Sequence, residues 1–218
     1  MHDVIIGIPT YFAGQMLTNC VNAILENVPD AKLFIYKNEI GWLQACNYIM
    51  RETQSDVILL NDDTIPLGNF VKEMEKVAYS DPLIGIVGAK MLAPNQETVI
   101  NYGIYIGPTG DTAHLNYGVS KDKITKVKKQ RAVEGSAMYI KRDLINEIGF
   151  FDERYTMGYR AEVSYCFLAR EAGRTVVSSP KSEIVHLVSQ TSARLNIQND
   201  THSIFMDQWG TKLKLGLI

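Results

Sequence analysis

The stretch that decides the fold of this chain is Val57-Ile58-Leu59-Leu60-Asn61-Asp62-Asp63-Thr64. Its apolar run, bounded by polar residues, predicts a strand buried on both faces, as in a parallel sheet. Open α/β sheets bind ligands at the carboxyl ends of their strands, where Asp62 and Asp63 would lie. Adjacent carboxylates repel each other and suit Mg²⁺ or Mn²⁺, which share their coordination with substrate phosphates. The stretch therefore indicates a site for a metal and a nucleotide diphosphate, or else an Asx turn or helix cap at Asp63 or Thr64.

Strand and helix patterns alternate around this stretch. Residues 4–8 and 33–36 predict two further strands, and apolar residues at helical spacing follow each of the three strands. Strands that alternate with helices in this way are typical of a parallel sheet with helices on both faces. We therefore expect residues 1–90 to form the nucleotide-binding half of the molecule.

The rest of the chain predicts shorter elements. The expected strands cover residues 84–89, 99–106, 113–119, 132–140, 175–178 and 184–188. Helices are expected at residues 141–148, at residues 161–172, where the pattern is apolar nearly all round, and from about residue 201 onward. A lysine-rich segment at residues 121–131 is interpreted as a solvated, mobile loop, with a basic patch for an acidic partner as the alternative.

No repeat or linker divides the chain, so we expect one domain over residues 1–218. Within it, residues 91–195 would form the acceptor and catalytic half, and residues 196–218 the C-terminal helix. The net charge of −2 gives no reason to expect nucleic acid as a partner. No apolar run reaches the ~20 residues of a membrane helix, and no signal peptide is recognisable at the start of the chain. The cysteines Cys20, Cys46 and Cys166 are interpreted as reduced core thiols of a cytoplasmic protein.

Four motifs follow one another along nearly the whole chain. They are Ile8-Pro9-Thr10-Tyr11; Asn38-Glu39-Ile40-Gly41 with Ala45-Cys46-Asn47; Leu60-Asn61-Asp62-Asp63-Thr64; and a long run from Gly135-Ser136-Ala137-Met138 through Gly149-Phe150-Phe151-Asp152-Glu153-Arg154 to Ala169-Arg170-Glu171-Ala172-Gly173 and His186. In this order they resemble the family-2 glycosyltransferases of the GT-A fold. The resemblance implies an α/β fold of one domain, in which a Rossmann-like mixed, mostly parallel sheet is flanked by helices.

The resemblance also implies an activity. A family-2 glycosyltransferase would use Mn²⁺ or Mg²⁺ and transfer a sugar, with inversion, from a nucleotide diphosphate donor to an acceptor hydroxyl. UDP is the favoured nucleotide, and the acceptor is a glycan, a lipid-linked sugar or a small molecule. The segment that usually follows the second strand in this family is shortened here, and Lys37 runs almost directly into Asn38, which leaves the base preference open.

The resemblance assigns roles to residues of this sequence. The implied nucleotide-binding residues are Pro9, Thr10, Tyr11, Asn38, Gly41, Asn47, Asn61 and Asp62. Asp63 and His186 would bind the metal, although a histidine on an apolar strand is also typical of a protein core. Ser192 and Arg194 would lie in a lid over the phosphates, where Arg194 could clamp them.

Glu162 is the predicted general base, which would deprotonate the acceptor hydroxyl. The family pattern places three acids near this position, and this chain has Ala161 and Ser164 at two of them. Asn61 likewise stands where many relatives carry an acid. Asp152 and Glu153 are the alternative bases. A sugar-nucleotide-binding module without catalysis therefore stays open, and a nucleotidyltransferase is a further, less favoured alternative.

Overall fold

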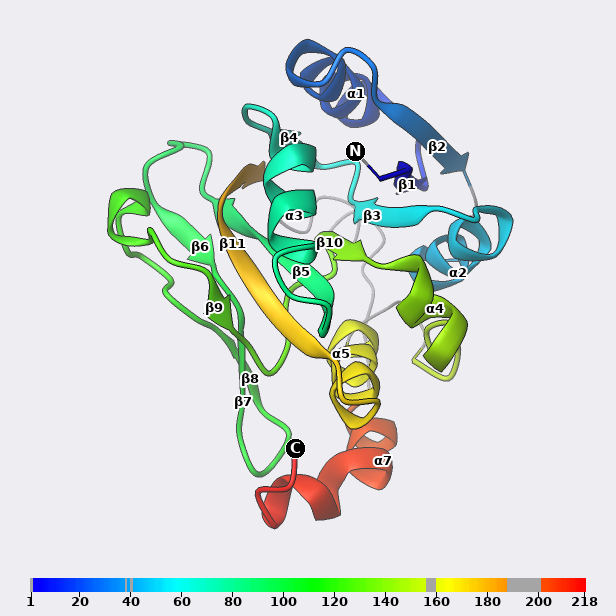
Figure 1. Cartoon of the computed structure of the whole chain (residues 1–218), viewed down its shortest axis with the longest axis vertical. Helices are drawn as coiled ribbons and strands as arrows, with labels where there is room; N and C mark the ends of the chain where they lie inside the picture. Colours follow the sequence, from blue (N-terminus) through cyan, green and yellow to red (C-terminus); the bar gives the residue numbers. More distant parts are fainter. Residues whose placement is uncertain (1, 38, 40, 156–159, 188–200) are drawn as a thin grey trace.

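The computed structural model describes residues 2–37, 39, 41–155, 160–187 and 201–218 (Figure 1). The strands are β1 (Val4–Thr10), β2 (Lys32–Lys37), β3 (Asp56–Leu60), β4 (Thr64–Pro66), β5 (Ile84–Leu92), β6 (Val99–Asn101), β7 (Ile104–Ile106), β8 (Thr112–His114), β9 (Lys128–Lys129), β10 (Ala137–Ile140) and β11 (Thr175–His186). The helices are α1 (Gln15–Asn27), α2 (Trp42–Glu52), α3 (Phe70–Ala78), α4 (Arg142–Ile148), α5 (Ala161–Glu171) and α7 (His202–Lys214), with a short 3₁₀ helix, η1 (Lys121–Lys123).

The central sheet has the strand order β2-β1-β3-β10-β5-β11-β4. β1 is parallel to β2 and to β3, and β11 is parallel to β5. β10 lies between β3 and β5 and is antiparallel to both, so the five long strands run in one direction. The expected mixed, mostly parallel α/β sheet is confirmed.

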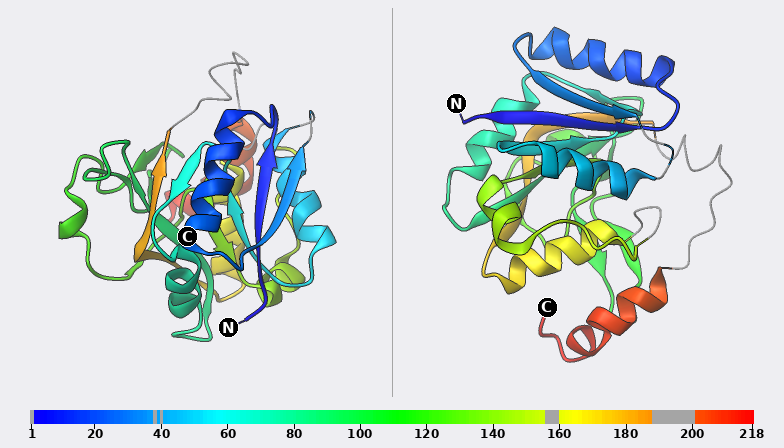
Figure 2. Two further views of the ribbon diagram at one scale, coloured as in Figure 1. Left: turned by 90° about the horizontal axis from the view of Figure 1, so that it is seen from above. Right: turned by 90° about the vertical axis from the view of Figure 1, so that its right-hand side faces the viewer.

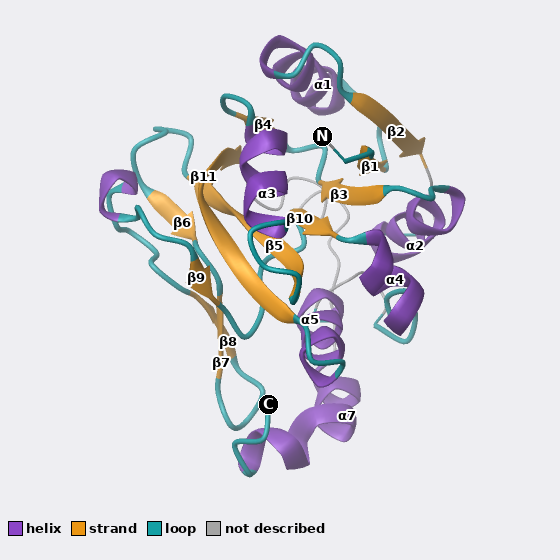
Figure 3. Cartoon of the chain, in the orientation of Figure 1, coloured by secondary structure: helices purple, strands orange, loops and turns teal. Residues whose placement is uncertain are grey.

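The sheet separates two apolar cores, and helices cover both of its faces (Figures 2 and 3). On β3, Val57 and Leu59 belong to the core that contains α2, α4 and α5, whereas Ile58 and Leu60 belong to the core of α1 and α3. Every residue of β3 is buried, which explains why the run from Val57 to Leu60 is apolar without alternation. A separate hairpin of β7 and β8 packs against α7 near Gly110, at the opposite end of the molecule from α1 (Figure 1).

Several predicted boundaries were wrong. The two strands expected at residues 175–178 and 184–188 are one strand, β11, whose register shifts between Ser178 and Glu183. Residues 99–106 form two short strands, β6 and β7, separated at Gly103, one of the glycines expected in turns, whose φ of +122° leaves the extended conformation. β4 and β9 were not expected, since two or three residues are too few to show a period.

The lysine-rich segment has exposed side chains, as predicted, but its backbone is held in place. The buried Lys90 Nζ donates hydrogen bonds to the carbonyl oxygens of Lys121 and Ile124, at 3.2 and 3.3 Å. The hydroxyl of Tyr102 donates to the carbonyl of Lys126 at 2.7 Å. The three cysteines are buried and free, as expected. None of the helices in the described ranges is long and apolar enough to cross a membrane.

Candidate active site

The candidate site lies at the carboxyl ends of β1 and β3. Because β10 is antiparallel to β3, the residues just before β10 lie beside the end of β3, and the Asn61 amide donates to the Ser136 carbonyl at 2.9 Å. β4 returns along the end of β11, which pairs Thr64 with His186. Four segments that are distant in sequence therefore meet at the acidic end of β3.

The first part of the site joins β1 to Asp62. Thr10 is buried, and its hydroxyl donates a hydrogen bond to Asp62 Oδ2 at 2.5 Å. The same hydroxyl oxygen accepts from the Ala13 amide at 3.1 Å. Tyr11 is only partly buried and makes an edge contact with Phe12, with 4.9 Å between the ring centroids. Thr10 and Asp62 are thus in contact, and Tyr11 extends the same edge.

Trp42 links the second part of the site. Its indole Nε1 donates to Asn61 Oδ1 at 2.6 Å. The ring also lies against Gly135: a Cβ atom at Gly135 would stand 2.9 Å from Trp42 Cη2 and 3.2 Å from Glu162 Cβ. A glycine is therefore needed between the indole and the predicted base, and Asn61, Trp42, Gly135 and Glu162 form one contiguous wall.

The third part of the site is centred on His186. Its Nε2 lies 3.3 Å from Asp63 Oδ1, and its Nδ1 lies 3.1 Å from Glu134 Oε1. The side chains of His186 and Asp63 are 8% and 7% exposed, and that of Glu134 is 18% exposed. Neither close contact counts as a hydrogen bond, so both ring nitrogens and Asp63 Oδ1 are held by ion-pair contacts alone. Glu134 Oε2, which is in neither contact, is also buried without a hydrogen-bond partner. Buried polar atoms of this kind are rare in proteins, and a bound ion or water is one of the usual reasons for them.

A divalent metal fits the Asp63–His186 pair. Asp63 Oδ1 and His186 Nε2 face each other, and carboxylate oxygen and imidazole nitrogen are both common ligands of Mn²⁺-type ions. Within the described residues, no group of three or more His, Cys, Asp or Glu side chains is placed to hold a metal. Among the described residues, Asp63 and His186 are thus the two side chains that would bind the metal, and a metal bound by so few side chains takes substrate oxygens and water as its other ligands.

The electrostatics of the site follow from burial. Burial alone would lower the pKa of His186, but the carboxylates of Asp63 and Glu134 outweigh it and raise that pKa to about 10. Burial alone would raise the pKa of Glu134, but His186 outweighs it and holds that pKa below its ordinary value. In the absence of a metal, a charged imidazolium thus lies between two carboxylates.

Burial determines the protonation behaviour of Glu162, the predicted general base. It lies in the first turn of α5 and is only partly exposed. Burial raises its pKa to about 7, and the nearby charge of Glu134 acts in the same direction. The amide group of its own backbone and Arg160 oppose this shift without cancelling it. The alternative bases have other partners: Asp152 pairs with Arg154 at 2.6 Å, and Glu153 pairs with Arg51 at 3.0 Å.

Two of the predicted nucleotide-binding residues have conformational or packing roles. Gly41 directly precedes α2 as its N-cap, with a φ of +147°, a conformation that other residues rarely adopt. Asn47 is fully buried and clamps the turn after α4: it donates to the Phe151 carbonyl and accepts from the Phe151 amide, both at 2.9 Å. Its amide also donates to Glu153 at 3.0 Å. Since its side-chain oxygen and amide are hydrogen-bonded within the chain, Asn47 has a structural role in joining α2 to this turn.

The other predicted residues are placed as follows. Pro9 lies in β1 opposite Tyr36 of β2, beside Thr10. Asn38, Ser192 and Arg194 lie outside the described residues. The sequence interpretation gave no site role to Glu134 or Trp42, and it named Gly135 only as part of a motif. The available signals were an acid directly before the Gly135-Ser136 motif and a tryptophan directly after Gly41, both next to predicted motifs.

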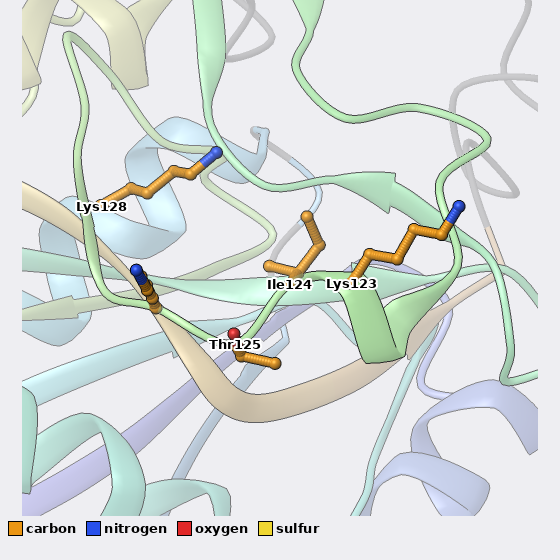
Figure 4. Close-up of a pocket in the computed structure, with 5 residues that line it drawn as sticks. Lys123, Ile124, Thr125 and Lys128 are labelled. Atoms are coloured by element: carbon orange, nitrogen blue, oxygen red, sulfur yellow. The ribbon is translucent and has the colours of Figure 1, made fainter.

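A separate hollow of about 150 Å³ lies in the lysine-rich segment (Figure 4). Its lining consists of Lys123, Ile124, Thr125, Lys126 and Lys128. It contains no carboxylate or imidazole, so it does not share the metal-binding chemistry of the strand-end site.

The sequence has distant similarity to two known proteins. No family model matches the chain. It is 22% identical over 175 residues to the O-antigen biosynthesis protein RfbC of Myxococcus xanthus, an alignment that covers 75% of this chain. It is 26% identical over 148 residues, 64% of this chain, to a protein of Sinorhizobium fredii that is described as uncharacterised. The chain spans only 14% and 16% of the lengths of these two proteins.

Solved structures show the fold. A crystal structure of GalNAc-T7 with UDP, GalNAc and Mn²⁺ superimposes with a TM-score of 0.68 at 12% identity, over 85% of this chain and 44% of that one. A mannosyltransferase from Pyrobaculum calidifontis, in complex with GDP-Man and Mn²⁺, superimposes with a TM-score of 0.59 at 12% identity, over 98% of this chain and 68% of that one. The chain therefore has the GT-A fold, as the sequence motifs predicted.

Proposed function

We propose that this chain with the GT-A fold is a metal-dependent inverting glycosyltransferase. It would transfer a sugar from a nucleotide diphosphate donor to an acceptor hydroxyl, with UDP-sugars as the first donors to test. The observation that carries the proposal is the buried Asp63–His186 pair, whose facing atoms make no hydrogen bond, at the strand ends where Gly135 contacts Glu162 of α5. Two proteins with the same fold have been crystallised with Mn²⁺ and a UDP or GDP-sugar ligand, which supports the donor class.

Asp63 and His186 would hold the metal, and Asp62, Asn61 and Thr10 would lie along the nucleotide. A bound divalent ion neutralises the negative charge that grows on the departing diphosphate. Thr10 fixes the Asp62 carboxylate, and Trp42 fixes the Asn61 amide, so both polar groups are oriented before the donor binds.

Glu162 would accept the proton of the acceptor hydroxyl. A base works best when its pKa lies near the working pH, and the pKa of about 7 meets that condition. The hydroxyl oxygen then attacks the anomeric carbon on the face opposite the diphosphate. The new glycosidic bond forms as the bond to the diphosphate oxygen breaks, which inverts the anomeric configuration.

The proposal is tested by calorimetric titration of UDP, with GDP and ADP alongside, in Mn²⁺ and then in EDTA. Wild type and the exposed-residue control Asp30→Asn should bind a nucleotide diphosphate only with the metal, whereas Asp63→Asn should not bind it. UDP-sugars would then be screened for donor hydrolysis and transfer. If no nucleotide binds in a metal-dependent way to wild type, the proposed function is wrong.

A binding module without catalysis is the second candidate, because Ala161 and Ser164 stand where the resemblance expects acids. Ser164 is buried, and it accepts a hydrogen bond from Trp209 Nε1 at 2.9 Å, so an acid there would not face the strand ends. Transfer or donor hydrolysis that is abolished in Glu162→Gln would exclude the binding module. Metal-dependent donor binding without turnover on a broad panel of acceptors would favour it.

A further inference from the structure

We infer that Glu134 is a positioning residue, which fixes the His186 imidazole so that Nε2 is presented to the metal beside Asp63. The inference rests on the metal site of the proposed function and adds a residue that none of the sequence motifs assigned. It concerns the protein's own side chains, so metal affinity tests it without any knowledge of the sugar or the acceptor.

The ring of His186 has a carboxylate at each nitrogen. Glu134 Oε1 lies 3.1 Å from Nδ1, and Asp63 Oδ1 lies 3.3 Å from Nε2, on the other side of the ring. Glu134 therefore faces the nitrogen that points away from Asp63. This geometry is that of a group which orients a metal-binding histidine, and not of a third ligand to the same metal.

The chemistry of imidazole requires such a partner. A histidine binds a metal through the lone pair of one nitrogen, and the other nitrogen then carries the proton and needs an acceptor. Nδ1 of His186 is buried and has no hydrogen-bond partner, and Glu134 supplies a carboxylate oxygen within reach. A small rotation of either side chain would complete the hydrogen bond, with Nδ1–H as donor.

The backbone holds both partners in place. Glu134 stands two residues from Ser136, whose carbonyl accepts from the Asn61 amide at 2.9 Å. His186 is paired with Thr64 across β11 and β4, and the Leu187 amide donates to the Asp63 carbonyl at 3.0 Å. Asp63, Glu134 and His186 thus come from three strand ends that are tied together by main-chain hydrogen bonds, as a preorganised site requires.

The experiment measures the affinity of the metal-free protein for Mn²⁺ by calorimetry, without nucleotide. Glu134→Ala should weaken Mn²⁺ binding by roughly 10- to 100-fold, since loss of such an orienting group has an effect of this size. Glu134→Gln keeps an acceptor oxygen and the side-chain volume, so it should recover part of the affinity. Glu97→Gln, on the exposed surface, should bind like wild type, and circular dichroism would show that each variant is folded.

A mutant cycle separates positioning from direct ligation. In a His186→Ala background, Glu134→Ala should change the Mn²⁺ affinity by less than about twofold, because Glu134 acts through the missing ring. If Glu134→Ala weakens binding there by its full factor again, Glu134 is a direct ligand and the inference is wrong.

Nuclear magnetic resonance gives a second readout. The chain has four histidines, so long-range ¹H–¹⁵N spectra with diamagnetic Mg²⁺ are readily assigned by removing His186. Wild type should show His186 with the proton on Nδ1, and Glu134→Ala should lose this preference. If wild type binds Mn²⁺ through Asp63 but Glu134→Ala binds it equally well, the inference fails and the proposed function stands. If wild type binds neither metal nor nucleotide, the proposed function fails with it.

Discussion

Glu162 is the residue whose environment most directly sets the expected chemistry. Its carboxyl must be ionised to accept a proton, and burial raises its pKa to about 7. We therefore expect kcat/KM to fall about tenfold for each pH unit below 7 and to level off above it. Measurement of kcat/KM against pH, once a donor and an acceptor are found, checks this. An activity that rises as the pH falls below 7 would contradict the assignment.

Removal of the same carboxylate gives the matching prediction. Glu162→Gln should lower kcat by roughly 10²- to 10⁴-fold and leave donor affinity unchanged, whereas the exposed control Glu52→Gln should have no effect. The folded state holds the Glu162 proton more tightly than the unfolded chain, so ionisation of Glu162 reduces stability as the pH rises through 7. Glu162→Gln should accordingly be at least as stable as wild type at pH 8, which a thermal melt would show.

The substitution Gly135→Ala tests how closely Trp42 and Glu162 pack against this position. The Cβ of Gly135→Ala would stand 2.9 Å from the Trp42 ring and 3.2 Å from Glu162 Cβ, so one of these side chains must move. A displacement of the base by about 1 Å costs on the order of 10²-fold in rate. Kinetic assays should show this loss for Gly135→Ala and not for Gly107→Ala, whose Cβ would make only ordinary contacts. Full activity in Gly135→Ala would show that Glu162 is not held by this contact.

At the scale of elements, α2 and the turn after α4 are joined by Asn47. Asn47→Ala would leave the buried amide and carbonyl of Phe151 without their partner, at a cost of about 1–3 kcal/mol in the free energy of unfolding. The Kd for metal-dependent nucleotide binding should differ from that of wild type by less than about twofold, which is well under 1 kcal/mol of binding free energy. Urea denaturation and calorimetry measure the two quantities, with the exposed Asn22→Ala as control. A loss of nucleotide affinity at unchanged stability would return Asn47 to the donor site.

The helix that carries Glu162 is fastened to α7 through Ser164. The Ser164 hydroxyl accepts a hydrogen bond from Trp209 Nε1 at 2.9 Å and donates one to Gln208 Oε1 at 3.2 Å. The Tyr155 hydroxyl also donates to Gln208 Oε1, at 2.9 Å. Ser164→Ala leaves the buried indole N–H unpaired and should reduce the free energy of unfolding by about 1–3 kcal/mol. The exposed Ser203→Ala should change it by less than about 0.5 kcal/mol. Equal stability of the two variants in denaturant melts would contradict this role.

At the scale of the whole molecule, ligand binding should raise thermal stability. At a UDP concentration of about 100 times Kd with saturating Mn²⁺, the folded state gains about 2.7 kcal/mol, which corresponds to a rise in Tm of roughly 5–10 °C for a chain of this size. EDTA should abolish the rise in wild type, and Asp63→Asn should not show it. A thermal-shift assay measures this, and a rise that persists in EDTA would contradict metal-dependent donor binding.

The sequence by itself determined the frame of the molecule. The apolar run of β3 and the alternation of strands and helices before Ala78 are local patterns. Burial on both faces makes a strand continuously apolar, and burial of one stripe spaces the apolar residues of a helix at the helical period. The end of β3 was therefore the predicted ligand-binding edge, and Thr10 and Asp62 are in contact there, next to Asp63. Glu162 followed from the motif at the start of α5.

Only the tertiary structure decided how the site is completed. β4 is three residues long and shows no period, yet its pairing with β11 sets His186 beside Asp63. The antiparallel insertion of β10 brings Glu134 and Gly135 to the end of β3. The packing of α2 directs Trp42 toward Asn61 and Asn47 toward Phe151. Strand order and register are set by contacts between residues far apart in the chain, and such contacts leave no local pattern in the residues that make them.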